Sequence, residues 1–97
     1  MSRKFRLEII TPAGATSART VTFLDVPAAY GRLTVLANHE PMICSLDAGF
    51  VRIREDEEFE EERWEIGKGS MKVTRNEVTL LVREIRPGSK ARKPASR

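Results

Sequence analysis

The sequence has little of the material from which catalytic and metal sites are built: one cysteine and one histidine in 97 residues. The single cysteine, Cys44, cannot form an internal disulfide, and a small domain without one fits a reducing compartment. It lies in an apolar, strand-like pattern, which indicates a buried and inert thiol. A structural zinc site takes about four ligands, so Cys44 and His39 alone do not supply one.

Long apolar runs and aromatic residues are also scarce. No stretch approaches the roughly 20 apolar residues of a membrane span. The start, residues 1–6, is basic but has no apolar segment behind it, so it lacks the pattern of a secretory signal. With four Phe, one Tyr and one Trp, the core of a 97-residue domain has to be mostly aliphatic.

No group of residues recommends an enzyme. His39 could pair as a base only with Cys44 or a serine, and no third residue is spaced to orient it. A structural or interface role for His39 is therefore favoured. The glycines at 67 and 69 are too closely spaced for a phosphate-binding loop and no helical pattern follows them.

Charge is unevenly distributed along the chain, although the net charge is only +3. Residues 55–62 carry seven of the fourteen acids, with Phe59 as the only apolar member, and residues 85–97 carry five bases and no acid. The acidic run lacks the spacing of a calcium loop and predicts a solvated loop. The sequence predicts one folded domain over 1–86 and a disordered basic tail over 87–97.

Apolar residues alternate with polar ones over most of the chain, which is the period of half-buried strands. Glycine, proline and asparagine separate these runs. Hairpin turns are predicted at Asp47–Gly49 and at Asn76. The glycines of Gly67–Gly69 predict a bulge or a close approach of two backbones. Val78–Val82 is apolar on both faces and predicts a central strand. The pattern predicts an all-β fold: a small antiparallel two-sheet sandwich or flattened barrel of about 8–10 short strands. The expected strands cover 5–10, 21–26, 33–36, 42–46, 50–54, 63–66, 71–73 and 78–82.

The stretch 31–41, GRLTVLANHEP, is the least generic. Leu33, Val35 and Leu36 form an apolar run that stops at Asn38 and Pro41, because asparagine tolerates left-handed backbone angles and proline forbids a ladder hydrogen bond. We expect a polar, histidine-bearing turn that stands out between two buried strands. Turns held on rigid strands are common sites of partner contact.

Single-stranded nucleic-acid binding by a small β-barrel is the alternative function. The basic tail could contact phosphates, and such barrels stack bases on aromatic rings. However, Phe23, Phe50 and Trp64 lie in phase with the apolar core pattern. Only Tyr30 and Phe59 are expected to be free, and acids that would repel a phosphate chain surround Phe59.

Four blocks of sequence resemble the epsilon subunit of the F-type rotary ATP synthase. Residues 31–41 are similar to its Gly-Glu-Phe-Gly-Ile-Leu-Pro-Gly-His-Ala-Pro segment, and residues 46–53, LDAGFVRI, to its Leu-x-Pro-Gly-x-Val-x-Ile. Residues 66–73, IGKGSMKV, and 76–81, NEVTLL, resemble its Gly-Gly-Phe-x-Glu-Val and Asn-x-Val-Thr-x-Leu. The likeness extends over about residues 4–84.

This resemblance implies a β-sandwich in the rotor without cofactor or catalytic residues. It implies binding to the gamma subunit and the c-ring, coupling of proton or sodium translocation to ATP synthesis, and no contact with nucleic acid. The place implied is peripheral, without membrane insertion, on the cytoplasmic face of a bacterial inner membrane. The partner-binding residues that the resemblance implies are Gly31, Arg32, Leu33, Asn38, His39, Glu40 and Pro41.

Three departures from the family pattern change these expectations. Arg32 replaces a common acid, so a basic ring loop would repel it unless the ring also differs. Thr34, Ala37 and Asn38 replace Gly, Pro and Gly, which changes the constraints on the turn. Many members continue into a C-terminal helical hairpin that blocks rotation and in some bacteria binds ATP. We expect neither a helical brake nor a nucleotide site here.

Overall fold

The computed structural model describes residues 3–14, 16–56 and 60–91, and within them the chain forms strands and turns without a helix. The alternation of apolar and polar residues therefore gives strands, as predicted. The described strands are β1 (Phe5–Ile10), β2 (Thr16–Val21), β3 (Phe23–Ala28), β4 (Gly31–Val35), β5 (Met42–Leu46), β6 (Gly49–Arg54), β7 (Glu61–Ile66), β8 (Gly69–Thr74), β9 (Glu77–Val82) and β10 (Ile85–Ala91).

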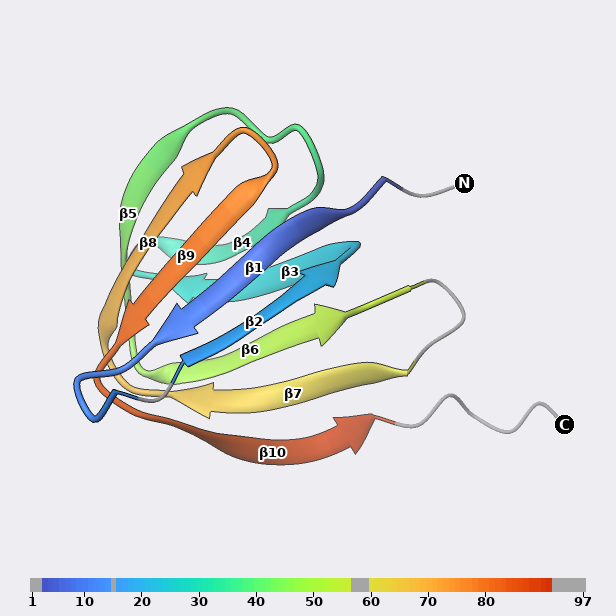
Figure 1. The fold of residues 1–97 in the computed structure, drawn as a ribbon. Helices are drawn as coiled ribbons and strands as arrows, with labels where there is room; N and C mark the ends of the chain where they lie inside the picture. The colour runs from blue at the N-terminus through green and yellow to red at the C-terminus, as the bar shows by residue number, and fades with distance from the viewer. Residues whose placement is uncertain (1–2, 15, 57–59, 92–97) are drawn as a thin grey trace, which may run out of the picture.

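One sheet folds over into two facing layers (Figure 1). Its hydrogen-bonded order is β10-β7-β6-β3-β5-β8-β9-β1-β2, and β4 pairs with β3. The layers join where β3 and β5 share a single residue pair, Ala28 with Leu46. The predicted small sandwich or flattened barrel is confirmed. One pairing departs from the antiparallel expectation, because β1 and β9 run parallel; they are far apart in sequence, so no short turn dictates their direction.

The core lies between the two layers and is almost wholly aliphatic, as expected from the few aromatic residues. Alternate residues of β1, β6, β8 and β9 contribute to it, which is the period of a sheet with one buried face. Val78–Val82 forms most of β9, which is central between β8 and β1, as predicted. The buried cluster comprises Phe5, Leu7, Ile9, Val21, Leu24, Val26, Val35, Leu46, Val51, Ile53, Ile66, Met71, Val73, Val78, Leu80 and Val82.

The predicted strand over 21–26 is wrong as a single element. The chain bends at Thr22, so that β2 ends at Val21 and β3 begins at Phe23. The Thr22 amide and hydroxyl both donate to the carbonyl of Arg54, which anchors the bend to the end of β6. β2 begins before the predicted start at Val21 and includes polar residues, because an edge strand need not be apolar on both faces.

The predicted hairpin at Asp47–Gly49 is also wrong. β5 pairs with β8, whereas β6 pairs with β3 and β7, so this turn carries the chain from one layer to the other. The Asp47 amide donates to the carbonyl of Pro27 at 2.8 Å. The second predicted hairpin is confirmed: Arg75 and Asn76 join β8 to β9, and Asn76 has φ 59°.

The chain end and the acidic run also differ from expectation. The predicted start of a disordered tail at residue 87 is wrong, because β10 continues to Ala91 along β7, with a register shift between Pro87 and Lys90; residues 92–97 lie outside the described part. The acidic run is not simply a solvated loop, because Glu61 and Glu62 belong to β7 and form ion pairs. Residues 57–59, including Phe59, lie outside the described residues.

An ion-pair cluster connects the two layers at the β2 edge. Arg19 of β2 is paired with the buried Leu7 of β1, so the two residues lie on the same, inward side of the sheet. Its guanidinium reaches Glu62 of β7 at 2.9 Å and Glu55 beyond β6 at 3.1 Å. The Trp64 indole N–H donates to the same Glu62 carboxylate at 3.0 Å. This cluster, Arg19 with Glu55 and Glu62, closes an edge that backbone pairing leaves open.

We expect Arg19→Met to lower the free energy of unfolding by about 2 kcal/mol, because it leaves two half-buried carboxylates without their cation. Urea unfolding measures the loss. Arg6→Met is the matched control, because Arg6 is exposed and its ion pair with Glu77 is 3.8 Å long, so its effect should stay within about 0.5 kcal/mol. Equal effects of the two substitutions would show that the cluster does not close the sandwich.

Candidate functional site

The seven residues predicted to bind a partner do not form one site. Gly31 and Arg32 follow the β3–β4 turn at one end of the sandwich, whereas Asn38–Pro41 follow β4 at the other end. The five residues of β4 separate them by about 16 Å. At the far end, the Asn38 amide donates to the Asn76 side chain at 3.1 Å, so this turn lies beside the β8–β9 turn.

The Asn38–Pro41 turn has the backbone geometry that the sequence suggested. Asn38 has φ 65°, in the left-handed region that asparagine tolerates. His39 is half-buried, and its Nδ1 lies 2.8 Å from the carbonyl oxygen of Glu40. This contact orients the ring within the turn and does not connect it to Cys44. Cys44 itself is only partly buried, and that burial raises the pKa of its thiol.

The prediction that the turn lies between two buried strands is wrong for β4. Among the described strands, β4 pairs only with β3, and it exposes Gly31, Arg32 and Thr34. Leu33 packs partly against the core, but Leu36 is exposed. An edge strand covered on one side has only one face to bury, so about half of the apolar run 33–36 remains accessible.

Arg32 is held by groups of its own layer. Its Nε and one Nη atom donate to Oδ2 of the buried Asp25 at 3.1 and 2.8 Å. The other Nη donates to the carbonyl of Phe50 at 2.9 Å, and the guanidinium lies 4.4 Å from the centre of the Phe50 ring. Thr34 donates to the second Asp25 oxygen at 3.2 Å. Asp25 thus offsets much of the charge of the arginine that replaces a family acid.

The contacts of Asp25 extend across the outer face of β4, β3, β6 and β7. Arg52 bridges two carboxylates, with one Nη 3.3 Å from Asp25 and Nε 2.9 Å from Glu61. Arg54 and Arg63 approach Glu61 at 3.6 and 3.7 Å. We call this set the arginine network: Arg32, Arg52, Arg54 and Arg63 with Asp25 and Glu61.

The aromatic rings of this face were wrongly predicted to belong to the core. Phe50 is exposed and lies between the guanidinium groups of Arg32 and Arg63. Phe23 lies beneath Arg52 and Arg54. Trp64, by contrast, packs against the core, as expected. The alternation of arginines with Val51 and Ile53 was the sequence signal for this face, but its partner Asp25 gave none.

The electrostatics of Glu61 follow from its position under the arginines. Hydrogen bonds from Arg52 lower the pKa of the Glu61 carboxyl, and partial burial opposes this only in part. The same hydrogen bonds raise the pKa of Arg52. The pair is therefore ionised across the neutral range and holds β6 to β7.

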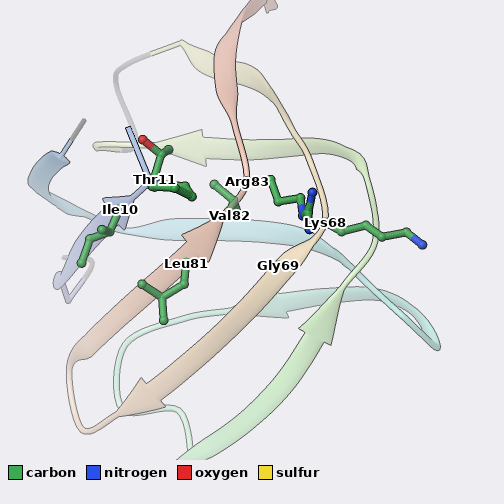
Figure 2. A pocket seen from close by; sticks show the side chains of 8 residues that line it. Ile10, Thr11, Lys68, Gly69, Leu81, Val82 and Arg83 are labelled. Atoms are coloured by element: carbon green, nitrogen blue, oxygen red, sulfur yellow. The ribbon is translucent and has the colours of Figure 1, made fainter. Parts of the chain in front are cut away.

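The outer face of the other layer carries an apolar, hollowed patch next to charged residues such as Glu8 and Lys72. Ile10, Leu81 and Ser70 are paired across β1, β9 and β8, and Leu81 is 50% exposed. A groove of about 470 Å³ lies here (Figure 2). A Cβ on Gly69 would lie 2.0 Å from the Leu81 carbonyl oxygen, which confirms the predicted close approach. The lining residues are Ile10, Thr11, Pro12, Lys68, Gly69, Leu81, Val82 and Arg83.

Two further observations concern possible metal and membrane sites. Within residues 3–14, 16–56 and 60–91, no three His, Cys, Asp or Glu side chains come together as a metal site would require. In the same part of the chain, no helix has the length and apolar character to cross a membrane.

Comparison with known proteins gives consistent similarities. The model of the ATP synthase delta/epsilon chain β-sandwich domain matches residues 4–88. An ATP synthase epsilon chain of Pelotomaculum thermopropionicum is 41% identical over 76 residues, which cover 78% of this chain and 55% of that protein. One of Desulfitobacterium hafniense is 29% identical over 90 residues, 93% of this chain and 67% of that protein. The chain thus spans little more than half of the first relative.

Two solved structures share the fold. A chain in the Euglena gracilis mitochondrial ATP synthase (OSCP/F1/c-ring) superposes with TM-score 0.74 and 22% identity over 84% of this chain and 51% of that one. A chain in the Tetrahymena thermophila mitochondrial ATP synthase (central stalk/c-ring) gives TM-score 0.69 and 14% identity over 87% and 66%. None of these similarities supports the nucleic-acid alternative.

We expect Asp25→Asn to destabilise the fold by about 2 kcal/mol, because two arginines lose the anion between them while the side-chain shape is kept. Urea unfolding measures this loss. Asp47→Asn, in the exposed turn after β5, is the control and should change stability by less than about 0.5 kcal/mol. If Asp25→Asn proved as harmless, Asp25 would not organise this face.

The lowered pKa of Glu61 predicts a pH dependence of stability. A carboxyl whose pKa is lower in the folded state stabilises the fold at pH values above its ordinary value, 4.5, and loses this contribution as the pH falls through the lowered pKa. The stability difference between wild type and Glu61→Gln should therefore shrink on acidification below pH 4.5. Thermal unfolding across pH measures it, with Glu8→Gln on the other layer as control. A difference independent of pH would contradict the assignment.

Proposed function

Because the chain belongs to the ATP synthase delta/epsilon family, through its β-sandwich domain, we propose that it is a non-catalytic central-stalk subunit of a rotary ATP synthase. In this role it binds the gamma subunit and the c-ring and couples proton or sodium translocation to ATP synthesis. The observation that carries the proposal is the family match over residues 4–88, which spans the described sandwich from β1 into β10. Its place would be peripheral, at the cytoplasmic face of a bacterial inner membrane.

The apolar patch on the outer face of β5, β8, β9 and β1 is the surface proposed for gamma. Ile43 of β5 is 75% exposed, and it shares this face with Leu81 and with Ile10. The centre of a protein–protein interface is depleted of charge and enriched in apolar groups, with polar groups at its rim. The turn with His39 and Pro41 leads directly into β5 and supplies such a rim.

The opposite end of β4 is proposed for the ring. Tyr30, at the tip of the β3–β4 turn, is 70% exposed, and Gly31, Arg32 and Leu33 follow it. The charge of Arg32 is largely offset by Asp25, so replacing a family acid with arginine introduces less repulsion toward a basic loop than the sequence suggested. The seven residues implied by the resemblance would then serve two partners at two ends.

Co-expression with the gamma and c subunits of the same organism tests this assignment. Tagged wild type should retain both gamma and the ring. Ile43→Glu combined with Leu81→Glu should lose gamma, because carboxylates would be buried in an apolar interface. Tyr30→Glu is the matched variant: it also replaces an exposed apolar side chain, and it should retain gamma but lose the ring.

Two outcomes would count against the proposal. A wild-type chain that stays monomeric beside its own gamma subunit would overturn the rotor assignment. Retention of gamma by the Ile43/Leu81 variant, with Tyr30→Glu losing gamma, would reverse the two faces. Unchanged thermal unfolding of the variants would show that lost binding does not reflect lost folding, because all three side chains are exposed.

A further inference from the structure

The outer face of β4, β3, β6, β7 and β10 carries more cations than anions. Cross-strand pairing places these residues together: Asp25 opposite Arg52, Arg52 opposite Arg63, and Glu65 opposite Arg86. Among the described residues that form ion pairs on this face, five arginines stand against three carboxylates, an excess of two positive charges. The arginines are Arg32, Arg52, Arg54, Arg63 and Arg86, and the carboxylates are Asp25, Glu61 and Glu65.

Depth separates the two signs of charge at the centre of this face, whereas Glu65, beside β10, is 59% exposed. The side chains of Asp25 and Glu61 are only 5% and 13% exposed. The guanidinium groups lie above them, and the side chains of Arg54 and Arg63 are 36% and 45% exposed. A partner approaching the centre of this face therefore meets the guanidinium groups of Arg54 and Arg63 before the carboxylates of Asp25 and Glu61.

The arginines are also held in place before any partner arrives. Arg32 and Arg63 lie over the Phe50 ring, at 4.4 and 4.9 Å from its centre. Arg54 lies 5.2 Å from the centre of the Phe23 ring. Stacking on an aromatic ring restricts the rotamers of a long side chain, so binding by these groups loses less conformational entropy than binding by free arginines.

Hydrogen-bonding capacity remains at the surface. Arg54 and Arg63 approach Glu61 only at 3.6 and 3.7 Å, which is beyond hydrogen-bonding distance. A guanidinium has five N–H donors in a planar fork that matches a carboxylate in two-point contacts. Arg54 and Arg63 can therefore each donate hydrogen bonds to a further carboxylate without breaking a short one.

We propose that this face docks an acidic segment of a partner protein, with its Asp or Glu carboxylates paired to Arg54, Arg63 and Arg86. The positive excess and the exposed guanidinium groups supply the charge complementarity. A nucleic acid fits less well, because guanidinium groups already cover the Phe23 and Phe50 rings on which bases would stack.

Fluorescence anisotropy of a labelled glutamate-rich peptide, titrated with the full chain at low salt and at physiological salt, tests this surface. Wild type should bind the peptide, and binding should weaken with salt. Arg54→Gln combined with Arg63→Gln should bind roughly tenfold more weakly. Lys72→Gln combined with Arg75→Gln is the matched control, because it removes the same charge from exposed positions on β8 and its turn.

The control variant should bind the peptide as wild type does. Equal weakening in both variants would mean attraction by net charge alone and would overturn the proposal, as would absence of peptide binding at low salt. Tighter binding of a labelled oligo-dT than of the peptide would assign the face to nucleic acid instead. Self-association of wild type that the Arg54/Arg63 variant loses would identify a second copy as the occupant, and this too would overturn it.

Discussion

The structure depends on folding one continuous sheet over itself so that its two halves share a core. The layers meet in a short backbone junction around Ala28 and Leu46, and the opposite edge is closed by the side chain of Arg19 with Glu55 and Glu62. Aliphatic burial supplies most of the stabilisation, but it is non-directional. This backbone junction and the ion pairs of Arg19 fix how the two layers face each other.

This arrangement gives the molecule two unlike outer faces. One layer presents the groove with Ile10 and Leu81 and leaves Ile43 exposed. The other is covered by the arginine network, in which each short contact to Asp25 or Glu61 also fixes a guanidinium over a ring. Because side chains alternate across a strand, the residues that do not enter the shared core face outward. The two layers differ in these outward-facing residues.

Local patterns gave the strand content, the Asn76 turn and the close approach at Gly69, because each depends on residues near in sequence. The same local patterns did not predict contacts between residues of strands that are distant in sequence. The alternation at Val51 and Ile53 could not show that the intervening arginines meet Asp25. The last strand was missed because its pairing with β7, rather than its own apolar content, holds it in place.

The sequence by itself determined the class of fold, the aliphatic core and, through its ordered blocks, the family, because period-2 alternation and turn residues act over a few positions. Only the tertiary structure decided that β5 and β6 belong to different layers, and that the stretch 31–41 extends from one end of the molecule to the other. It also decided that Arg32 turns toward Asp25. Those outcomes depend on which strands become neighbours, and long-range pairing is set by burial of the whole core rather than by any one segment.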